Sequence, residues 1–532
     1  MCYQRAMENP VAGLVTPEAH RAAVTAIQQL VRARPDGKRL SVKKATPSHV
    51  LRDTGYKREA HRVDISALDG VLAVDAAALT ARIQGTMTMG ALVDFLLPLG
   101  LVPAVTPEIP RFTVSGLING EGLETSSHRY GVFSDALREV ELVLGDGSLL
   151  VASEHDNVDF FIGLRESQGT VGIVTAATIR VAPAKAFVLS TYRRFDTVEA
   201  YLAALRTALV EDADDFIEGV LFAADFNVLI TSRFVAEAPA DVPEYHPTRD
   251  GERYYFQHVR HALRADAEAR DVVPTREYLF RAERGFFWLT EAHVGVPPLT
   301  GTEWGRRFVD KKVREAYESE GFGPHLVSEE VRNRHLVYQD LGVALDRVPE
   351  IVRWIGDNIG VYPLWNCPIR LMTPEHLPAL PAAAPGAHRY LVDVGVYGAP
   401  TVKSYRAHVT VAELQRKVDF PSLWGPIYLG REELAGKRGF DLAAHDELRA
   451  RYHANGAFAH LYDKITWAGD TAPAAGGPSS LWRLERDFGP KWYKKPGALL
   501  TLAVGFMVVA PWKIYDDIRE SAAARKRKKA AK

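Results

Sequence analysis

Cysteine is almost absent from this chain. Only Cys2 and Cys367 occur among its 532 residues. Two cysteines build neither a disulfide framework nor a cysteine-based metal site, so we expect no metal and a reducing compartment. An excess of charge of one sign is absent too, because 65 basic residues stand against 66 acidic ones. That balance gives no general attraction to nucleic acid, and we expect no such partner.

Two further absences limit the class of protein. Residues 1–10 contain no apolar stretch of the kind that a secretory signal requires, and no repeat with a period of about 20 to 50 residues is visible. The remaining composition, with 47% hydrophobic and 25% charged residues, is ordinary for a folded soluble protein. A chain of this length is expected to form about two or three domains.

One run near the C-terminus carries no charge: residues 497–512 read GALLTLAVGFMVVAPW. It is shorter than the roughly 20 apolar residues of a spanning helix. Tryptophan, tyrosine and lysine flank it on both sides, and residues 525–529 read RKRKK, a pattern typical of a membrane interface. We therefore expect this segment to attach an otherwise cytoplasmic protein to the cytoplasmic side of a membrane. The alternative is a buried core helix followed by a solvated basic tail.

Glycine is concentrated in one segment, where residues 113–125 read TVSGLINGEGLET and are followed by SSHRYG. Gly116, Gly120 and Gly122 permit a turn with positive φ and a close approach of a ligand to bare N–H groups. Such groups suit a diphosphate, whereas the alternative is an ordinary tight turn. The segment lies between extended stretches, so we predict a loop. A Rossmann site is rejected, because Thr125 replaces the third glycine and the next residues begin a helix poorly.

Periodicity divides the sequence into an α+β domain ending near Pro183, a second α/β region and a mostly helical end. The first is predicted to have helices at residues 16–34, 88–97 and 159–165, and strands at 40–42, 63–65, 71–74, 81–83, 140–144, 149–151 and 169–183. The second is predicted to have strands at 220–222, 228–230, 363–365 and 390–396, and a solvated polar helix face at 254–264. Residues 411–467 are predicted to be mostly helical, with a run at 453–464.

Several ordered blocks together resemble known flavoproteins. Besides the glycine segment they are GTVGIVTAATIRVAP (169–183), FIEGVLF (216–222), VYPLWNCP (361–368), DVGVYG (393–398) and LYDKI (461–465). The protein resembles the vanillyl-alcohol oxidase / p-cresol methylhydroxylase superfamily and, more closely, the delta(24)-sterol reductase (Diminuto/Dwarf) family, over roughly residues 40–465. Block 169–183 is similar to the strand pair that closes the FAD domain of that superfamily.

The resemblance implies an α+β fold whose FAD-binding domain, of the p-cresol methylhydroxylase type, has two α+β subdomains. Its expected units are an FAD-binding domain at 1–185, an α/β cap or substrate domain at 186–400, a helical segment at 401–470 that returns to the FAD domain, a linker at 471–490, and an apolar helix with a basic tail at 491–532. Two features depart from the families: the membrane segment of animal and plant sterol reductases is missing at the N-terminus, and His49 lies outside the glycine-rich context in which many oxidases attach FAD covalently. We therefore expect non-covalent FAD, with its diphosphate between the glycine segment and residues 41–52.

The resemblance also implies which residues bind FAD. They are Thr113, Val114, Ser115, Gly116, Leu117, Ile118, Asn119, Gly120, Glu121, Gly122, Leu123, Glu124, Thr125, Ser126, His128, Gly172, Ile173 and Val174. His128 and Arg129 directly follow the glycine segment and are expected near FAD, the alternative being a solvated turn. Cys367 has no partner in a C-x-x-C pattern and is expected to pack rather than to react.

The activity implied by the resemblance is reduction, by NADPH through bound FAD, of a C=C bond in the side chain of a sterol or in an isoprenoid lipid. Such a reduction requires a proton donor in a pocket poor in water. The family blocks offer four candidates: Glu218, Tyr362, Asp393 and Tyr397. Alternatively, Glu218 pairs with an arginine, Tyr362 fills core and Asp393 caps a turn. The alternative activity is an FAD-dependent oxidase or dehydrogenase of an alcohol or sugar that passes electrons to O₂ or a carrier.

Overall fold

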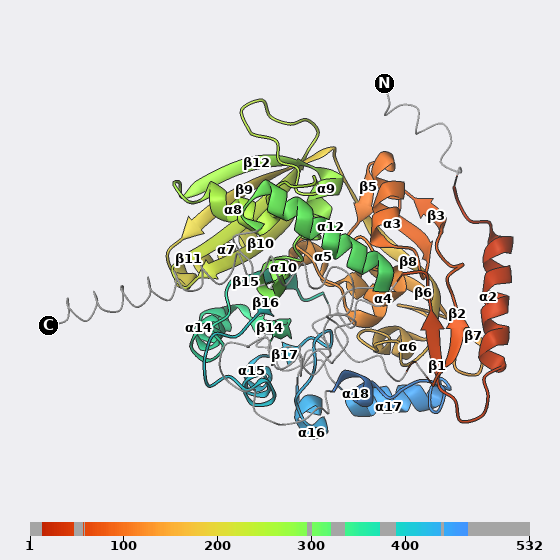
Figure 1. The fold of residues 1–532 in the computed structure, drawn as a ribbon. Coiled ribbons are helices and arrows are strands. Elements are labelled where there is room, and N and C mark those ends of the chain that lie inside the picture. Colours follow the sequence, from red (N-terminus) through yellow and green to blue (C-terminus); the bar gives the residue numbers. More distant parts are fainter. Residues whose placement is uncertain are drawn as a thin grey trace.

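The computed structural model describes residues 13–46, 57, 59–294, 300–320, 336–372, 390–437 and 441–466. In these ranges the strands form a two-stranded, a six-stranded and a nine-stranded sheet (Figure 1). The chain passes from the six-stranded to the nine-stranded sheet between Pro183 and Phe187. The C-terminal expectations at 471–490 and 491–532, and His49, lie outside the described residues.

The six-stranded sheet has the order β3-β4-β8-β6-β7, and β5 pairs with β8. Its strands are β3 (Val71–Asp75), β4 (Thr80–Gln84), β5 (Leu101–Pro103), β6 (Leu137–Val143), β7 (Leu149–Ser153) and β8 (Ile173–Pro183). Beside it, β1 (Leu40–Lys43) and β2 (His61–Asp64) form a parallel pair. The strands predicted for this region are confirmed. Block 169–183 holds one strand and not a pair, because β8 covers residues 173–183 without a break and pairs with β4, β5 and β6, whereas residues 169–172 lie outside any strand.

Two helices of this region were correctly predicted, because local capping and periodicity agree there. α2 (Pro17–Arg32) begins after Thr16, and α3 (Met89–Leu96) begins after Thr88. Each threonine hydroxyl accepts a backbone N–H from the first turn, at 3.2 and 3.3 Å. The third helix, α6 (Val158–Gly163), is also confirmed.

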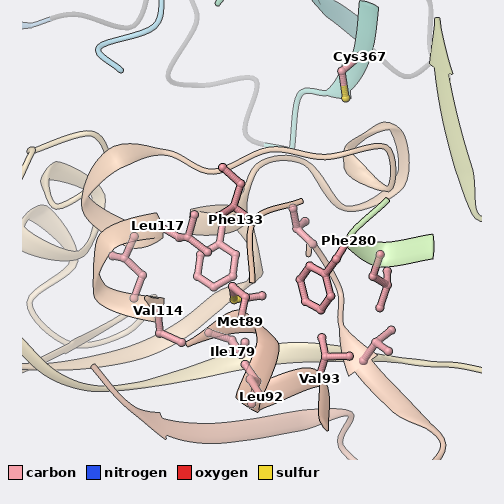
Figure 2. Packing of buried hydrophobic residues seen from close by; sticks show 14 of the residues in the cluster. Met89, Leu92, Val93, Val114, Leu117, Phe133, Ile179, Phe280 and Cys367 are labelled. Carbon is pink, nitrogen blue, oxygen red and sulfur yellow. The ribbon is translucent and has the colours of Figure 1, made fainter. Parts of the chain in front are cut away.

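Residues 114–120 of the glycine segment are helical, so the prediction of a loop was wrong there, whereas residues 121–126 lie outside any helix. The helical residues form α4 (Val114–Gly120), and the SSHRYG tail forms the short helix α5 (Ser127–Tyr130). Thr113 caps α4 by accepting the Gly116 N–H at 3.3 Å. Figure 2 shows Val114 and Leu117 gathered with Phe133 in the core cluster that also holds α3. This buried apolar face outweighs the low helix propensity of glycine.

The nine-stranded sheet has the order β12-β9-β11-β10-β15-β16-β14-β17, and β13 pairs with β16. Its strands are β9 (Phe187–Phe195), β10 (Phe216–Ala223), β11 (Phe226–Val235), β12 (Glu268–Pro274), β13 (Val337–Gln339), β14 (Leu341–Ala344), β15 (Leu364–Arg370), β16 (Tyr390–Gly398) and β17 (Phe420–Pro421). All four strand predictions for this region are confirmed. α7 (Val198–Glu211) and α14 (Val348–Asn358) contact each other and share one hydrophobic cluster with strands of this sheet.

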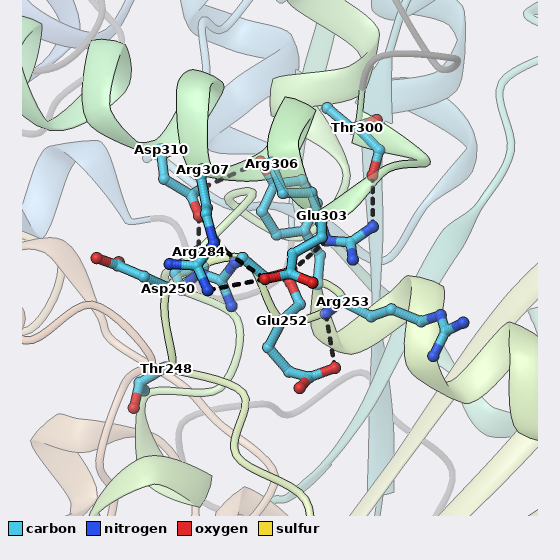
Figure 3. Close-up of polar contacts among 12 residues, drawn as sticks. Thr248, Asp250, Glu252, Arg253, Arg284, Thr300, Glu303, Arg306, Arg307 and Asp310 are labelled. Atoms are coloured by element: carbon cyan, nitrogen blue, oxygen red, sulfur yellow. Dashed lines mark hydrogen bonds and ion pairs between the residues drawn. The ribbon is translucent and has the colours of Figure 1, made fainter.

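A further group of helices lies beside this sheet, held by a hydrophobic cluster that it shares with the strands and by polar contacts. It consists of α8 (Tyr255–Ala262), α9 (Thr275–Leu279), α10 (Leu289–Val294) and α12 (Glu303–Glu320). Figure 3 shows Arg284 facing Asp310 of α12, with 2.8 Å between Nη2 and Oδ2. Arg306 donates to the carbonyls of Gly251 and Thr300 at 2.9 Å each. α8 buries Tyr255, Phe256, Gln257 and Val259, so residues 254–264 are only partly a solvated face.

The C-terminal region returns to the first domain. It contains α15 (Ala412–Lys417), α16 (Arg431–Ala435), α17 (Leu442–Arg451) and α18 (Leu461–Ile465). Arg449 of α17 donates to the carbonyls of Thr170 and Ala459, and Tyr452 donates to Asp159 at 2.7 Å. The helical run predicted at 453–464 was wrong, since His453 and Gly456 have positive φ and the helix begins only at α18. None of the helices in the described ranges has the length and hydropathy needed to cross a bilayer.

Candidate active site

A cavity of about 320 Å³ lies where the two large sheets and the C-terminal region meet. β1, α4, the start of β8 and residues 458–464 contribute to one part of its wall. Strands β15 and β16, together with Phe287 and Trp424, contribute to another part. This volume is within the range of cofactor and small-molecule sites.

Most of the residues predicted to bind FAD line this cavity. They are Thr113, Ser115, Gly116, Leu117, Asn119, Gly120, Glu121, Gly122, Leu123, Gly172, Ile173 and Val174. Val114 and Ile118 belong to the hydrophobic core. Glu124, Thr125, Ser126 and His128 are buried but do not belong to the cavity lining.

His128 and Arg129 join the glycine segment to the domain that carries the nine-stranded sheet. The His128 ring lies 2.8 Å from the Thr125 carbonyl and 3.1 Å from the Asp214 carbonyl, and burial lowers its pKa. Arg129 donates to Asp215 at 2.8 Å. Neither residue lines the cavity, so the structure gives both a role in holding the two domains together.

Asn119 fixes the loop before β8 against α4. Its amide group donates to the Ser115 carbonyl at 2.7 Å, and its Oδ1 accepts the Ser167 hydroxyl at 3.0 Å and the Gly169 N–H at 3.1 Å. Its carbonyl accepts the Gln168 N–H at 2.8 Å. Gln168 and Gly169 both have positive φ, so the loop is turned sharply at the cavity wall.

Lysine side chains surround one part of the cavity. Lys44 Nζ donates to Thr113 Oγ1 at 3.0 Å, and burial, reinforced by the charge of Lys57, lowers its pKa to about 8. Lys57 also lines the cavity, and burial lowers its pKa. Lys464 of α18 donates to the Gln168 carbonyl. Cations from two distant parts of the sequence thus face a glycine-rich wall, an arrangement suited to an anion.

Two glycines lie beside these ammonium groups. A Cβ at Gly116 would lie 3.0 Å from Thr113 Oγ1 and 3.8 Å from Lys44 Nζ, and a Cβ at Gly169 would lie 3.8 Å from Lys464 Nζ. At Gly120 a Cβ would meet no atom within 4 Å. Bare backbone, open space and cations therefore coincide, and the residues present fit the diphosphate of FAD.

Aromatic and acidic side chains, in contrast to the lysines and glycines, line another part of the cavity wall. The Phe287 ring lies 5.1 Å from Trp365 and 5.5 Å from Tyr397, and Tyr397 lies 6.3 Å from Trp424. Asp340 and Glu108 line the same cavity, and the Tyr397 hydroxyl donates to Asp340 Oδ1. This part of the wall combines apolar rings with carboxyl groups.

These carboxyl groups hold protons unusually well. Burial raises the pKa of Asp340 to about 6. Burial and the neighbouring charges of Glu124 and Asp340 raise the pKa of Glu108 well above its usual value. Burial and the Asp340 charge do the same for Asp393. Desolvation without a compensating cation favours the neutral acid.

The four residues predicted as proton donors lie at different distances from this wall. Tyr397 lines the cavity, and Asp393 is buried behind Asp340 on the same strand as Tyr397. Glu218 pairs with Arg281 at 2.8 Å and accepts Trp365 Nε1–H at 2.8 Å, and it is not part of the lining. Tyr362 packs against the hydrophobic cluster of α7 and α14, away from the cavity lining.

Sequence reasoning missed Asp340, Glu108 and the lysines. Lys44 lies within residues 41–52, which were expected near the diphosphate, and Lys464 lies in the LYDKI block. A lysine beside a strand predicted near the diphosphate was an available signal. Asp340, in VYQDLG, carries no local sign of its role.

Comparison with known proteins shows what this chain is similar to. A family model described as an FAD binding domain matches residues 12–153, which contain β1, α4 and Lys44. The Delta(24)-sterol reductase of Homo sapiens is 29% identical over 463 residues, covering 84% of this chain and 87% of that protein. This chain is a homologue of the delta(24)-sterol reductases, and it has an FAD-binding domain. The similarity extends to plants and nematodes. The Delta(24)-sterol reductase of Pisum sativum is 29% identical over 453 residues, 78% of each protein, and the homolog dhcr-24 of Caenorhabditis elegans is 28% identical over 483 residues, 85% of this chain and 89% of that protein.

Proposed function

We propose that this protein is an FAD-dependent oxidoreductase that reduces a C=C bond in the side chain of a sterol, with NADPH as electron donor. The observation that carries the proposal is one continuous cavity, in which a lysine- and glycine-lined part meets a part lined by aromatic rings and acids. The similarity to delta(24)-sterol reductases over most of the sequence supports the substrate class and the donor. An isoprenoid lipid with the same kind of double bond fits the same chemistry.

The protein's own residues bind the anionic part of the cofactor and prepare the other part of the cavity for the alkene. Lys44, Lys57 and Lys464 neutralise the diphosphate, and α4 presents glycine backbone at the same wall. Phe287, Trp365, Tyr397 and Trp424 provide an apolar surface that excludes water. FAD, when bound and reduced, supplies a hydride.

Reduction of an unconjugated double bond also needs an acid. Once the alkene accepts a proton, positive charge develops on carbon, and nearby water would trap it. An acid with a raised pKa in a dry pocket supplies the proton while water is kept away from the developing positive charge, and the acidic wall around Asp340 provides such groups.

Anaerobic single-turnover mixing tests the proposal. The purified protein is mixed with NADPH while flavin absorbance is followed near ~450 nm, and desmosterol, a sterol with a Δ24 double bond, is then added. We expect NADPH to bleach the flavin and desmosterol to restore its colour. Failure of NADPH to bleach the flavin, with bleaching by an alcohol or sugar instead, would refute the reductase and indicate an oxidase or dehydrogenase.

We further propose that residues 497–512 and the basic residues after them bring the enzyme to a membrane, where sterols reside. The support is the sequence pattern of an uncharged run flanked by aromatic and basic residues. Flotation with liposomes containing anionic lipid tests this. The full-length protein is expected to float with the vesicles and a protein ending at residue 490 is expected to remain at the bottom, and equal behaviour of the two would contradict the proposal.

A further inference from the structure

Asp340 is a cavity carboxyl group whose position is fixed on both sides. It lies between β13 and β14, which both pair with β16. Its carbonyl accepts the Ser422 N–H at 2.9 Å. A carboxyl group held in this way offers a defined direction for proton transfer, as an acid that acts on a bound substrate requires.

Tyr397 fixes the side chain of Asp340. Its hydroxyl donates to Asp340 Oδ1, and its own carbonyl accepts Trp288 Nε1–H at 2.7 Å. The ring of Tyr397 packs against Phe287 and Trp424. Because Oδ1 accepts the tyrosine hydroxyl, Oδ2 is the oxygen left to carry a proton.

Burial raises the pKa of Asp340 to about 6, whereas the hydrogen bond from the Tyr397 hydroxyl acts in the opposite direction. Asp393 of β16 and Glu108, from the segment before α4, lie close enough for the charge of Asp340 to raise their pKa values. Within the described ranges no ion pair joins Asp340, Asp393 or Glu108 to a cation, and Arg281 contacts Glu124 and Glu218 instead. An excess of buried acids over cations favours neutral carboxyl groups.

We propose that Asp340 is the catalytic acid of the reduction and that Tyr397 is the residue that positions it. The inference rests on the proposed function, which supplies the alkene and the reduced cofactor. Asp340 is preferred to Glu108 because Tyr397 holds its carboxyl group against the aromatic wall, whereas Glu108 interacts with Glu124. Glu121, another carboxyl group of the lining, is turned toward Ser134 and Arg165.

The reaction balances in atoms and electrons. The π pair of the C=C takes the proton from Asp340 Oδ2 and forms one C–H bond. A hydride from the reduced cofactor, itself reduced by NADPH, forms the second C–H bond at the neighbouring carbon. Asp340, left as a carboxylate, regains a proton from solvent, so one NADPH and one proton are consumed for each alkene reduced.

Anaerobic stopped flow of Asp340→Asn, Asp340→Glu, Glu108→Gln and Tyr397→Phe tests the assignment with the full-length protein. In Asp340→Asn we expect NADPH to bleach the flavin within about twofold of the wild-type rate, and this also shows that the variant is folded. Recovery of the colour on desmosterol should slow by about 10²–10⁴-fold, the usual contribution of an acid. Asp340→Glu should restore part of that loss, and Glu108→Gln should slow recovery by less than about tenfold.

The pH dependence separates the acid from its positioning residue. Wild-type recovery should slow as the pH rises through the pKa of Asp340, and that slope should vanish in Asp340→Asn but persist, at a lower rate, in Tyr397→Phe. Recovery in Asp340→Asn within about threefold of wild type, or a loss in Glu108→Gln as large as in Asp340→Asn, would overturn the assignment while the proposed function stands. A wild-type protein that NADPH does not bleach, or that no alkene reoxidises, would overturn both.

Discussion

Arg281 is expected to be one of the most costly side chains of this protein to remove. It is 2% exposed, and its Nη2 lies 3.0 Å from Glu124 Oε1 and 2.8 Å from Glu218 Oε1. Its guanidinium also stacks 4.3 Å from the centre of the Tyr278 ring. Replacement by methionine fills most of the volume but leaves two buried carboxyl groups without their cation.

The magnitude follows from that arrangement. Breaking a buried ion pair by removing one partner costs about 3–5 kcal/mol. In the variant the two carboxyl groups can take up protons, which reduces this cost. The reduction is about 1.4 kcal/mol for each unit by which the pKa of a carboxyl group in the folded variant exceeds the ambient pH. Because a raised carboxyl pKa gives stability that is present at low pH and lost as the pH rises, Arg281→Met should cost about 3–5 kcal/mol at about pH 8 and clearly less at about pH 5.5.

Urea unfolding of the FAD-saturated protein, followed by tryptophan emission, measures this cost. The matched control is Arg276→Met, since Arg276 pairs with Asp94 at an exposed site, at 3.0 Å between Nη2 and Oδ2. Exposed pairs contribute about 0–1 kcal/mol. Adding Glu124→Gln and Glu218→Gln to Arg281→Met should recover much of the loss. The reasoning is refuted if Arg281→Met costs no more than Arg276→Met at the higher pH, or the same at both pH values.

Three further predictions concern Lys44 of the cavity lining and two residues outside that lining, Glu166 and Gly85. Lys44→Met should weaken FAD binding about 10–100-fold, as measured by titration calorimetry, whereas the control Lys43→Met, at the neighbouring exposed pair with Asp64, should not. The FAD affinity of the wild type should fall as the pH rises through about 8, where Lys44 loses its charge in the free protein. An affinity that does not change with pH would contradict this. Burial, and then the charge of Glu121, raise the pKa of Glu166 to about 8, so ionisation of Glu166 should lower the free energy of unfolding by about 1–3 kcal/mol as the pH rises from about 5 to 9. Melting curves of Glu166→Gln should lack that fall, whereas those of the exposed control Glu447→Gln should keep it. Identical curves for the two variants would disprove the prediction. Gly85→Ala would place a Cβ 2.3 Å from the Val174 carbonyl oxygen and should lower the free energy of unfolding, measured in urea, by about 1–3 kcal/mol. The control Gly436→Ala should lower it by less than about 0.5 kcal/mol. Equal urea midpoints for the two variants would show that the backbone of β8 moves aside without cost.

The elements that sequence reasoning placed correctly are those whose signals are local. Thr16 and Thr88 each cap a helix with a periodic apolar face, and six of the 11 residues of β8 are β-branched. α4 was missed because the glycine segment that contains it holds three glycines close together, a composition that favours a loop. The core contact of Val114 and Leu117, which decides the outcome, involves residues distant in sequence.

The residues of the site likewise divide into those with a local sequence signal and those without one. Gly116 and Gly120 were found because glycines close together in sequence are unusual in themselves. Asp340 and Lys464 were not, because a single charged residue looks in sequence like any solvated surface position. Their roles come from the fold, which brings residues more than 200 positions from the glycine segment to the same cavity.

The charges around the cavity restrict how FAD and substrate share it. A diphosphate near Asp340 and Glu108 would force buried like charges together, whereas at Lys44 and Lys464 it is neutralised. The same separation protects the acid, because a lysine beside Asp340 would lower its pKa and remove the proton that the reduction consumes. One distribution of charge thus favours the diphosphate beside the lysines and raised carboxyl pKa values at the aromatic wall. We therefore expect a lysine introduced at Ser422, beside Asp340, to slow alkene reduction while FAD stays bound.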